Sequence, residues 1–378
     1  MNPLLFRRLT INGKFLTARP TGVHRVADQL IRQIVLNHDI LDGVFRSSPA
    51  IVAPRSASEG THGVQVERYG RLRGQLWEQM DLPRAARSDL LLNLCNLGPV
   101  GLRNAITMIH DAQVFITPQS YSVAFRTWYK TILPLIGRRH RRILTVSHFS
   151  AEQLVRAGVT DAERISVIHN GVDHVLQYPR APEIINRLSL ERRRFVVALS
   201  STQAHKNIKV LLDAFSSPEL CDIKLVLFGG HDRRDFERLY SHVPANVVFA
   251  GPVTDGELRS LYEAALCVGF PSTTEGFGLP PLEGMALGCP AVVAPCGALP
   301  EVAGQGALYA AAGNPREWGE AIKSLAASPP FWLERSVEAA AQAANFTWRK
   351  AGADLCDVIR LVADDRQRMP GWRANGSD

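Results

Sequence analysis

The chain has 378 residues, of which 46% are hydrophobic and 21% charged, a composition that excludes a disordered chain. This length exceeds that of one ordinary compact domain, so we expect two domains. The net charge of +7, from 43 basic and 36 acidic residues, is a mild excess. It is compatible with an anionic partner or a lipid surface, and we expect no nucleic-acid partner.

Cysteine usage and apolar runs bear on the compartment. The six cysteines form no CxxC pair and mostly lie in apolar runs, so we expect buried, reduced thiols in a reducing compartment. The first fifteen residues lack a long apolar segment with a small-residue cleavage site, which argues against a signal peptide. No apolar run approaches the roughly 18 residues that span a bilayer. We therefore expect a cytoplasmic protein, or one attached to the inner face of a membrane.

Short runs rich in Val, Ile and Leu, mostly without polar alternation, recur along the chain and are typical of strands buried on both faces of a parallel sheet. In the first half we predict strands near residue 9 and at 89–97, 105–110, 142–147 and 165–170. In the second half we predict strands at 195–200, 223–230, 246–251, 265–272 and 290–295.

Helical patterns separate these runs. One begins after Gly22, one follows Lys206, and a third begins with a capping box in which Thr254 and Glu257 bond reciprocally. Strand–helix alternation in two blocks predicts an α/β chain of two doubly wound domains. We place the domains at 1–175 and 195–347. The charged, proline-containing segment 176–194 is the linker between them, and the stretch before the loose tail at 366–378 reads as two helical pieces.

The segment 120–142 has an amphipathic pattern. Phe125, Trp128, Tyr129, Ile132 and Ile136 recur at helical spacing, and a basic cluster follows at 138–142. Such a helix usually packs into a core. The alternative is that it docks on an anionic membrane surface.

The stretch STTEGFGLPPLEGMALG at 272–288 carries the chemistry. Its loop follows a predicted strand and precedes a predicted helix, at the edge where open α/β sheets bind ligands. Gly276 and Gly278 allow close backbone approach, and the helix start favours an anion, most simply a phosphate. We place Glu283 in the first helical turn, where it can accept from the hydroxyls of a ribose. Glu275 would then lie nearer a sugar.

Two other interpretations of this stretch stay open. It could be an ordinary strand–loop–helix connection in which Glu283 complements the helix dipole and Glu275 is solvated. The two carboxylates could also form the acid and base of a hydrolase, although this leaves the glycines and the phosphate-ready helix start without a role.

EGFGLPPLE, followed by a helix and the strand PAVVA, resembles the Glu–seven–Glu region of retaining glycosyltransferases of family 4. Further segments resemble this family in the right order from about residue 10 to 360: RPTGVHRVADQL, IHDAQVF, TVSHFSAEQL, ISVIHNGVD, AHKNIKVLLDAF, ALPEVAGQGALY and FTWRKAGADL. ISVIHNGVD is similar to the turn that the family writes as I-P-N-G-V-D. The resemblance implies the GT-B fold, in which two Rossmann-like domains face a central cleft. It also implies an acceptor-binding domain at 1–175, a nucleotide-sugar domain at 195–347, and a helix in 348–378 that crosses back to the first domain.

The resemblance implies roles for single residues. Three have a catalytic role: His110 lies near the reacting sugar carbon, Glu275 contacts sugar hydroxyls and Lys206 holds the diphosphate. The residues that would bind the donor are Gly22, Ser201, Lys206, Glu275, Gly276, Phe277, Gly278, Leu279 and Glu283. The family works without a metal or other cofactor, and the chain shows no DxD-like donor motif. An Arg that the family often has about six residues before the Lys is absent, since Ser200 and Ser201 stand there.

The resemblance implies transfer of a sugar from a nucleotide diphosphate to an oligosaccharide or a polyprenyl-diphosphate-linked acceptor. GDP-mannose is the donor we favour, with UDP-glucose and dTDP-rhamnose as alternatives. A nucleotide-sugar epimerase on the same fold, or a relative that binds nucleotide-sugar without turnover, are the competing interpretations. The absence of the Arg supports the second interpretation, a relative that binds nucleotide-sugar without turnover.

Overall fold

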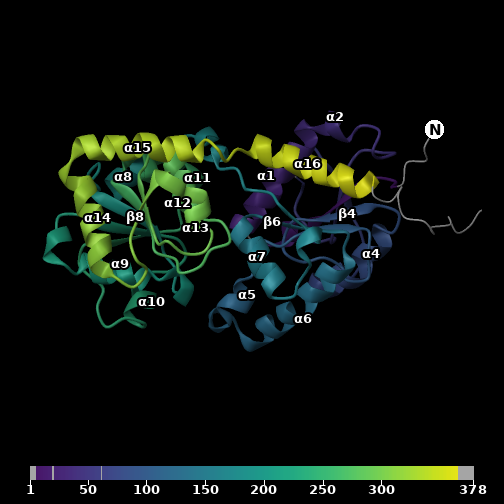
Figure 1. Ribbon diagram of the computed structural model, residues 1–378, viewed down its shortest axis with the longest axis horizontal. Helices are drawn as coiled ribbons and strands as arrows, with labels where there is room; N and C mark the ends of the chain where they lie inside the picture. The colour runs from purple at the N-terminus through teal and green to yellow at the C-terminus, as the bar shows by residue number, and fades with distance from the viewer. Residues whose placement is uncertain (1–5, 19–20, 61, 365–378) are drawn as a thin grey trace, which may run out of the picture.

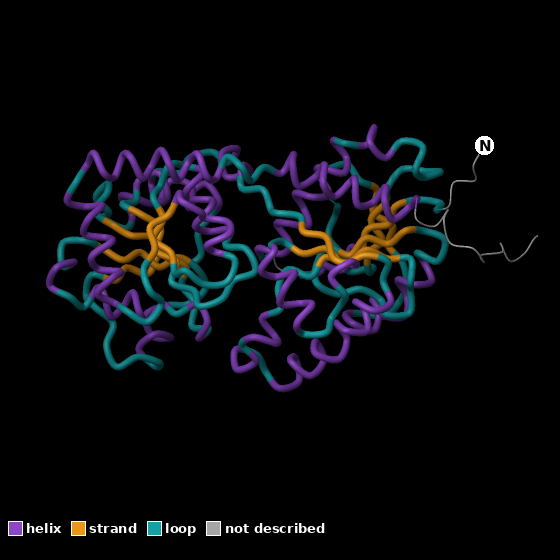
Figure 2. Tube along the Cα trace, viewed as in Figure 1, coloured by secondary structure: helices purple, strands orange, loops and turns teal. Residues whose placement is uncertain are grey.

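The computed structural model describes residues 6–18, 21–60 and 62–364, and these residues form two parallel sheets (Figure 2). The first sheet has the order β3-β2-β1-β4-β5-β6-β7. Its strands are β1 (Leu9–Asn12), β2 (Ala50–Ala53), β3 (Gln65–Arg68), β4 (Leu90–Asn93), β5 (Ala105–Met108), β6 (Arg142–Thr145) and β7 (Ile165–Val167). The order reverses between β1 and β4, so the carboxyl ends of these two strands flank a natural ligand position.

The second sheet repeats this plan with the order β10-β9-β8-β11-β12-β13. Its strands are β8 (Phe195–Leu199), β9 (Lys224–Phe228), β10 (Val247–Gly251), β11 (Cys267–Phe270), β12 (Ala291–Val293) and β13 (Ala307–Tyr309). Here the reversal lies between β8 and β11. Lys206 follows β8 and Glu275 follows β11, so the topology alone brings these two side chains to one edge of the sheet.

Helices cover both sheets (Figure 1). We call each sheet, together with the helices that cover it, a body of the protein. The first body carries α1 (Gly22–Leu36), α2 (His38–Leu41), α3 (Gly74–Leu76), α4 (Leu82–Ala85), α5 (Gln113–Ile116), α6 (Val123–Arg139) and α7 (His148–Arg156). The linker carries α8 (Glu183–Arg187). The second body carries α9 (Ile208–Phe215), α10 (Arg233–Glu237), α11 (Asp255–Ala264), α12 (Leu279–Ala286), α13 (Leu299–Ala303), α14 (Pro315–Ala327) and α15 (Pro329–Ala343), and the described chain ends with α16 (Trp348–Asp364).

The predicted doubly wound α/β architecture is confirmed, and every predicted strand is present in shortened form. The capping box of Thr254 and Glu257 is also present, with the Glu257 amide 3.2 Å from the Thr254 hydroxyl. Three further strands, β2, β3 and β13, were not predicted. The strand β3 is only partly buried and β13 spans three residues, so neither leaves a long apolar run.

The last helix returns to the first body. In Figure 1, α15 lies over the second body and α16 continues across to lie beside α1. Leu355, Ile359 and Val362 bury the apolar face of α16. At the closest approach, a Cβ built on Gly352 would lie 2.3 Å from the Cβ of Gln33 on α1. The predicted crossing helix is therefore present, and only a residue without a side chain fits at its contact with α1.

Other expectations have mixed outcomes. Cys267, Cys289 and Cys356 are buried free thiols, whereas the expectation of burial is wrong for Cys221, which is exposed in the short connection before β9. None of the described helices combines the length and apolarity needed to cross a bilayer. The predicted loose tail at 366–378 lies outside the described residues.

The contact between α16 and α1 yields a stability prediction. We expect Gly352→Ala to lower the free energy of unfolding by about 1–3 kcal/mol, because the added methyl forces two packed helices apart. Gly319→Ala in α14 is the matched control, since its Cβ meets no atom within 4 Å. The control should gain about 0.5–1 kcal/mol from helix propensity. Urea unfolding measures both variants, and equal effects would contradict the packing argument.

Candidate functional site

A cavity of about 800 Å³ lies between the two bodies, where the loops after the strands of both sheets meet. The predicted site residues that line it are Gly22, His110, Lys206, Glu275, Gly276, Phe277, Gly278, Leu279 and Glu283. Ser201 is not among the lining residues. Its hydroxyl lies 3.3 Å from the Gln203 amide, within the turn after β8. The structure thus brings the predicted residues together with this one exception.

The loop between β11 and α12 forms one wall of the cavity. A Cβ on Gly276 would lie 2.5 Å from the carbonyl oxygen of His110, so the backbone of the second body touches the first body here. The hydroxyl of Ser147, at the start of α7, donates to the Gly276 carbonyl at 2.6 Å. Gly278 adopts φ of 108°, a left-handed conformation that glycine tolerates at no steric cost. These contacts fix the loop against its neighbour.

The same loop presents unused hydrogen-bond donors. Within the described part of the chain, the backbone N–H groups of residues 275–279 donate no hydrogen bond. They lie between a strand end and the start of α12, where the helix dipole is positive. Pro280 and Pro281 occupy the next positions and have no N–H to offer. The arrangement is a cradle of amides suited to an anion such as a phosphate.

Lys206 lines the same cavity and pairs with the side chain of the first residue of this cradle. Its Nζ is 2.7 Å from Oε1 of Glu275, and both side chains are largely buried. The next residue, Asn207, is in the left-handed conformation, and its amide donates to the carbonyls of Pro271 and Ala312. The Asn207 contacts fix the turn that carries Lys206. Because the two opposite charges compensate each other, an incoming anion would have to displace the carboxylate of Glu275 before it could pair with Lys206.

Glu283 lies in the second turn of α12, which begins at Leu279, so the predicted position in the first turn is wrong. The two prolines, which fit a first turn, stand at its second and third residues. Oε1 of Glu283 is 3.1 Å from Nε2 of His174 and 3.7 Å from Nη1 of Arg25. The guanidinium of Arg25 also reaches Oδ1 of Asp255 at 2.5 Å. Arg25 therefore bridges α1 of the first body to α11 and α12 of the second.

Sequence reasoning missed Arg25, His174, Tyr178 and Asp255, which line the cavity or contact Glu283. Two of them had a detectable signal. Arg25 lies one turn after Gly22 on the same helix, and Asp255 begins the helix that follows β10. Functional side chains at the carboxyl ends of parallel strands are expected there. His174 and Tyr178 had no comparable signal, since they lie outside the strand–helix units.

His110 and Asp111 line the cavity on the side that the first body forms. Burial lowers the pKa of His110 to about 4, so the ring is neutral near pH 7. Its Nε2 lies 2.8 Å from the carbonyl of Leu94, which only accepts, and therefore carries the proton. This leaves Nδ1 as an acceptor. The carboxylate of Asp111 caps the following turn by accepting from the Gln113 amide at 2.9 Å. Burial, and to a lesser extent the negative charge of Glu275, raises the pKa of Asp111.

A carboxylate also joins the two bodies beside the site. Glu301, on α13, accepts hydrogen bonds from the amides of His148 and Phe149 in the first turn of α7, at 2.9 and 3.0 Å. Nε2 of His169 lies 2.7 Å from the same carboxylate. The second body thereby caps a helix of the first body, which holds the cavity walls in register.

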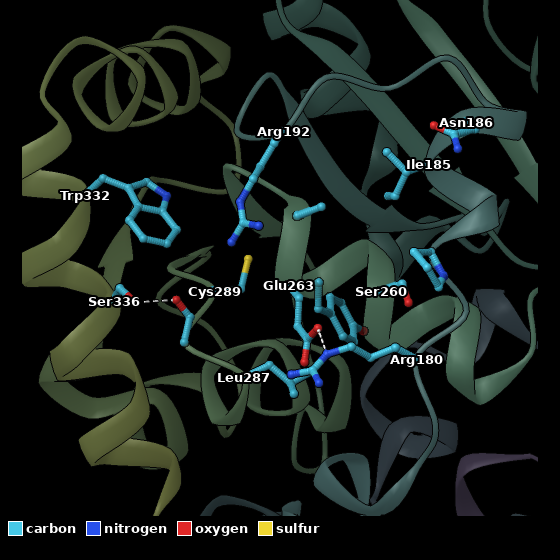
Figure 3. Close-up of a pocket in the computed structure, with 14 residues that line it drawn as sticks. Arg180, Ile185, Asn186, Arg192, Ser260, Glu263, Leu287, Cys289, Trp332 and Ser336 are labelled. Carbon is cyan, nitrogen blue, oxygen red and sulfur yellow. Dashed lines mark hydrogen bonds and ion pairs between the residues drawn. The ribbon is translucent and has the colours of Figure 1, made fainter.

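A second cavity, of about 670 Å³, lies between the linker, α11, the turn after α12, and α15 (Figure 3). Arg180 and Glu263 pair at 2.6 Å on its wall, and Ser336 donates to the Gly288 carbonyl. It contains none of the predicted site residues. The cavity between the bodies has the cation, the two carboxylates and the unused amides, and we assign the site to it.

Comparison with known proteins agrees with this assignment. The family model "Glycosyltransferase Family 4" matches residues 21–176, and the family model "Glycosyl transferases group 1" matches residues 181–345. Together they cover both bodies of the chain.

Named relatives are similar over much of their length. The chain is 25% identical over 374 residues to O-antigen chain mannosyltransferase B of Escherichia coli, covering 90% of this chain and 96% of that protein. It is 28% identical over 241 residues to the O-antigen chain mannosyltransferase RfbU of Salmonella typhimurium, covering 60% of this chain and 62% of that protein.

Solved structures share the fold. Anabaena Alr3699/HepE, in complex with UDP-glucose, superposes with a TM-score of 0.70 at 18% identity, covering 94% of this chain and all of that chain. WaaG, a glycosyltransferase involved in lipopolysaccharide biosynthesis, superposes with a TM-score of 0.69 at 15% identity, covering 93% and 99%. The fold is therefore GT-B.

The burial of His110 yields a pH prediction. Its pKa of about 4 in the fold lies below the ordinary value of about 6.5, so the unfolded chain binds an extra proton between these values. The free energy of unfolding should fall as the pH drops from 6.5 towards 4, by up to about 1.4 kcal/mol per pH unit for this group. His110→Gln should remove that part of the slope in urea unfolding at pH 7.5, 6 and 5. An unchanged slope would show that His110 is not buried in its neutral form.

Proposed function

Because the chain belongs to glycosyltransferase family 4, among the group 1 glycosyl transferases, we propose that it transfers a hexosyl group from a nucleotide diphosphate sugar to a growing oligosaccharide or a polyprenyl-diphosphate-linked acceptor. GDP-mannose is the proposed donor, and polysaccharide synthesis at the bacterial surface the proposed process. The names of the O-antigen mannosyltransferase relatives support both choices.

The observation that carries this proposal is the cradle of amides at residues 275–279, which have no acceptor in the described part of the chain, with Lys206 paired to Glu275 and Glu283 on the helix that follows. The diphosphate of the donor binds the amides and Lys206. Glu283 accepts from the ribose hydroxyls on one side, and Glu275 accepts from the sugar hydroxyls on the other. Each polyol thus meets one carboxylate, and the anion between them meets only donors.

The proposed reaction retains the configuration at the anomeric carbon. The bond from this carbon to the diphosphate oxygen breaks as the bond to the acceptor oxygen forms on the same face. The departing phosphate oxygen takes the proton of the acceptor hydroxyl. Lys206 and the amides stabilise the charge that develops on the phosphate, without a metal ion. His110, neutral and with Nδ1 free to accept, binds a sugar hydroxyl near the reacting carbon.

The acceptor enters from the first body. On the side of the first body, the cavity is lined by Phe15, Leu16, Ser58 and Glu59, which belong to the loops after β1 and β2. Two of these side chains are apolar and two are polar, so this part of the cavity suits a sugar, which offers both apolar faces and hydroxyl groups.

A direct test supplies the purified protein with GDP-mannose, UDP-glucose or dTDP-rhamnose and an extract of lipid-linked acceptors. We expect transfer from GDP-mannose, and we expect GDP to raise the melting temperature more than UDP or dTDP. Lys206→Met should lower kcat/KM by about 10²–10³-fold, since it removes a charge that stabilises the leaving phosphate.

Lys209→Met is the matched control for this test. Lys209 is exposed and pairs with Asp213 on α9, one turn after Lys206, so its loss should leave kcat/KM within about twofold. No transfer from any donor would contradict the proposed function. An altered sugar released without acceptor would favour the epimerase, and nucleotide binding without turnover would favour the silent relative.

We also propose that α6 docks on an anionic membrane, where a lipid-linked acceptor would lie. Ile132, Leu133 and Ile136 of this helix are buried, as a core helix requires. Yet nearer the start of the helix, on this same face, Phe125 is 39% and Trp128 40% exposed, and Val123, its first residue, is 66% exposed. The rings of Tyr121, Phe125 and Tyr129 stack in sequence, with centroid separations of 5.2 and 4.2 Å. A helix whose amino-terminal half leaves apolar side chains exposed, with exposed Arg138 and Arg139 at its other end, suits a lipid interface.

The docking surface can be tested with liposomes. Phe125→Ser with Trp128→Ser, or Arg138→Glu with Arg139→Glu, should reduce sedimentation with vesicles containing phosphatidylglycerol by about tenfold. Arg141 and Arg142 are left intact, because they donate to Asn104 and Ser166 within the fold. Leu333→Ser with Val337→Ser, on the exposed side of α15, is the control and should bind as the wild type does. Unchanged binding of both test variants would remove the proposal.

A further inference from the structure

Three buried side chains from distant parts of the chain form a line that ends at Glu283. Trp348, the first residue of α16, lies with its Nε1 2.9 Å from Nδ1 of His174. Nε2 of His174 lies 3.1 Å from Oε1 of Glu283. Trp348 is 2%, His174 1% and Glu283 5% exposed. Water therefore has almost no access to either hydrogen bond.

The chemistry of the three groups fixes the direction of both bonds. An indole N–H only donates, so Nδ1 of His174 accepts and has no proton. The ring proton then lies on Nε2 and is donated to the carboxylate of Glu283. Arg25 Nη1, at 3.2 Å from Nε2, also only donates, so this contact is not a hydrogen bond. The line therefore runs in one direction, from Trp348 through His174 to Glu283.

The start of α16 is fixed in turn. The amide of Trp348 donates to Oδ1 of Asp173 at 2.8 Å, and the amide of Val172 donates to the Phe346 carbonyl at 2.9 Å. A Cβ on Gly171 would lie 2.2 Å from the backbone nitrogen of Trp348, so the two segments are in contact. The indole thus has little freedom to move relative to His174.

We propose that Trp348 and His174 are positioning residues, which orient the carboxylate of Glu283 for the ribose of the donor. One oxygen of Glu283 is held by His174, and within the described residues the other has no hydrogen-bond partner. This oxygen is left for the ribose hydroxyls. The inference rests on the proposed function, and it assigns to the crossing helix a part in reading the nucleotide. A carboxylate held by a second layer of hydrogen bonds loses less conformational freedom when it binds.

The test uses the preference for ribose over 2′-deoxyribose, which a purely structural role would not alter. Calorimetry would measure the binding of GDP and 2′-deoxy-GDP. If UDP raises the melting temperature more than GDP does, UDP and 2′-deoxy-UDP would be used instead. We expect the wild type to bind the ribonucleotide about tenfold or more tightly. Trp348→Phe keeps the ring and removes the N–H. It should reduce the preference to below about threefold, and raise the donor KM with kcat within about threefold.

Two further comparisons control for folding. Trp318→Phe removes an indole bond of similar length, from a buried tryptophan of α14 to the Ala311 carbonyl, and should keep the full ribose preference. His174→Gln, which can accept and donate in the same line, should keep most of the preference, whereas His174→Leu should lose it. In a Glu283→Gln background, Trp348→Phe should have no further effect on the ratio.

The outcomes separate this inference from the proposed function. If the wild type binds no nucleoside diphosphate, the proposed function fails. If it prefers the ribonucleotide and both Trp348→Phe and His174→Leu keep that preference, the positioning role is wrong and the proposed function stands. Equal wild-type affinity for the ribo- and deoxyribonucleotide would overturn the inference as well, because Glu283 would then not read the ribose.

Discussion

The ion pair between Lys206 and Glu275 sets the charge balance on which the rest of the cleft depends. The two residues follow β8 and β11, the strands at which the order of the second sheet reverses. With only 18% and 10% of their side chains exposed, each charge depends on the other for compensation. In the proposed reaction, a diphosphate replaces the carboxylate beside Lys206. The same exchange releases the oxygens of Glu275 for the donor sugar, so binding the anion and freeing the sugar contact are one event.

The cleft is a property of both bodies together. Gly276 touches the His110 carbonyl, Arg25 reaches from α1 to Glu283, and Glu301 caps α7 from across the cavity. Each contact joins a backbone or charged group of one body to a partner in the other. A change in the angle between the bodies would break several of them at once. Donor binding and closure of the cleft are therefore expected to be coupled.

Much of the fold and most of the site could be predicted from the sequence, because long apolar runs and a glycine-rich loop are local signals. The runs at 195–200 and 223–230 predicted β8 and β9 well, whereas the partly buried β3, with its sequence QVER, has no apolar run to detect. Glu275 and Lys206 were predicted because they follow strands. His174 contacts Glu283 and Trp348, which are both distant from it in sequence, and no pattern along the chain encodes such contacts. Ser201 follows β8, as Lys206 does, but its hydroxyl bonds to the Gln203 amide and is not among the groups that line the cavity.

The position of α16 has a consequence for how the protein is made. The helix is the last described element of the chain, yet its apolar residues Leu355 and Ile359 pack on the first body, beside α1. During synthesis, the amino-terminal body emerges from the ribosome long before this helix exists. The surface of α1 that α16 will cover is then open to water and to other chains. Completion of the first body therefore waits until the whole second body has been synthesised, and a nascent chain stalled within the second body exposes this surface to aggregation and to chaperones.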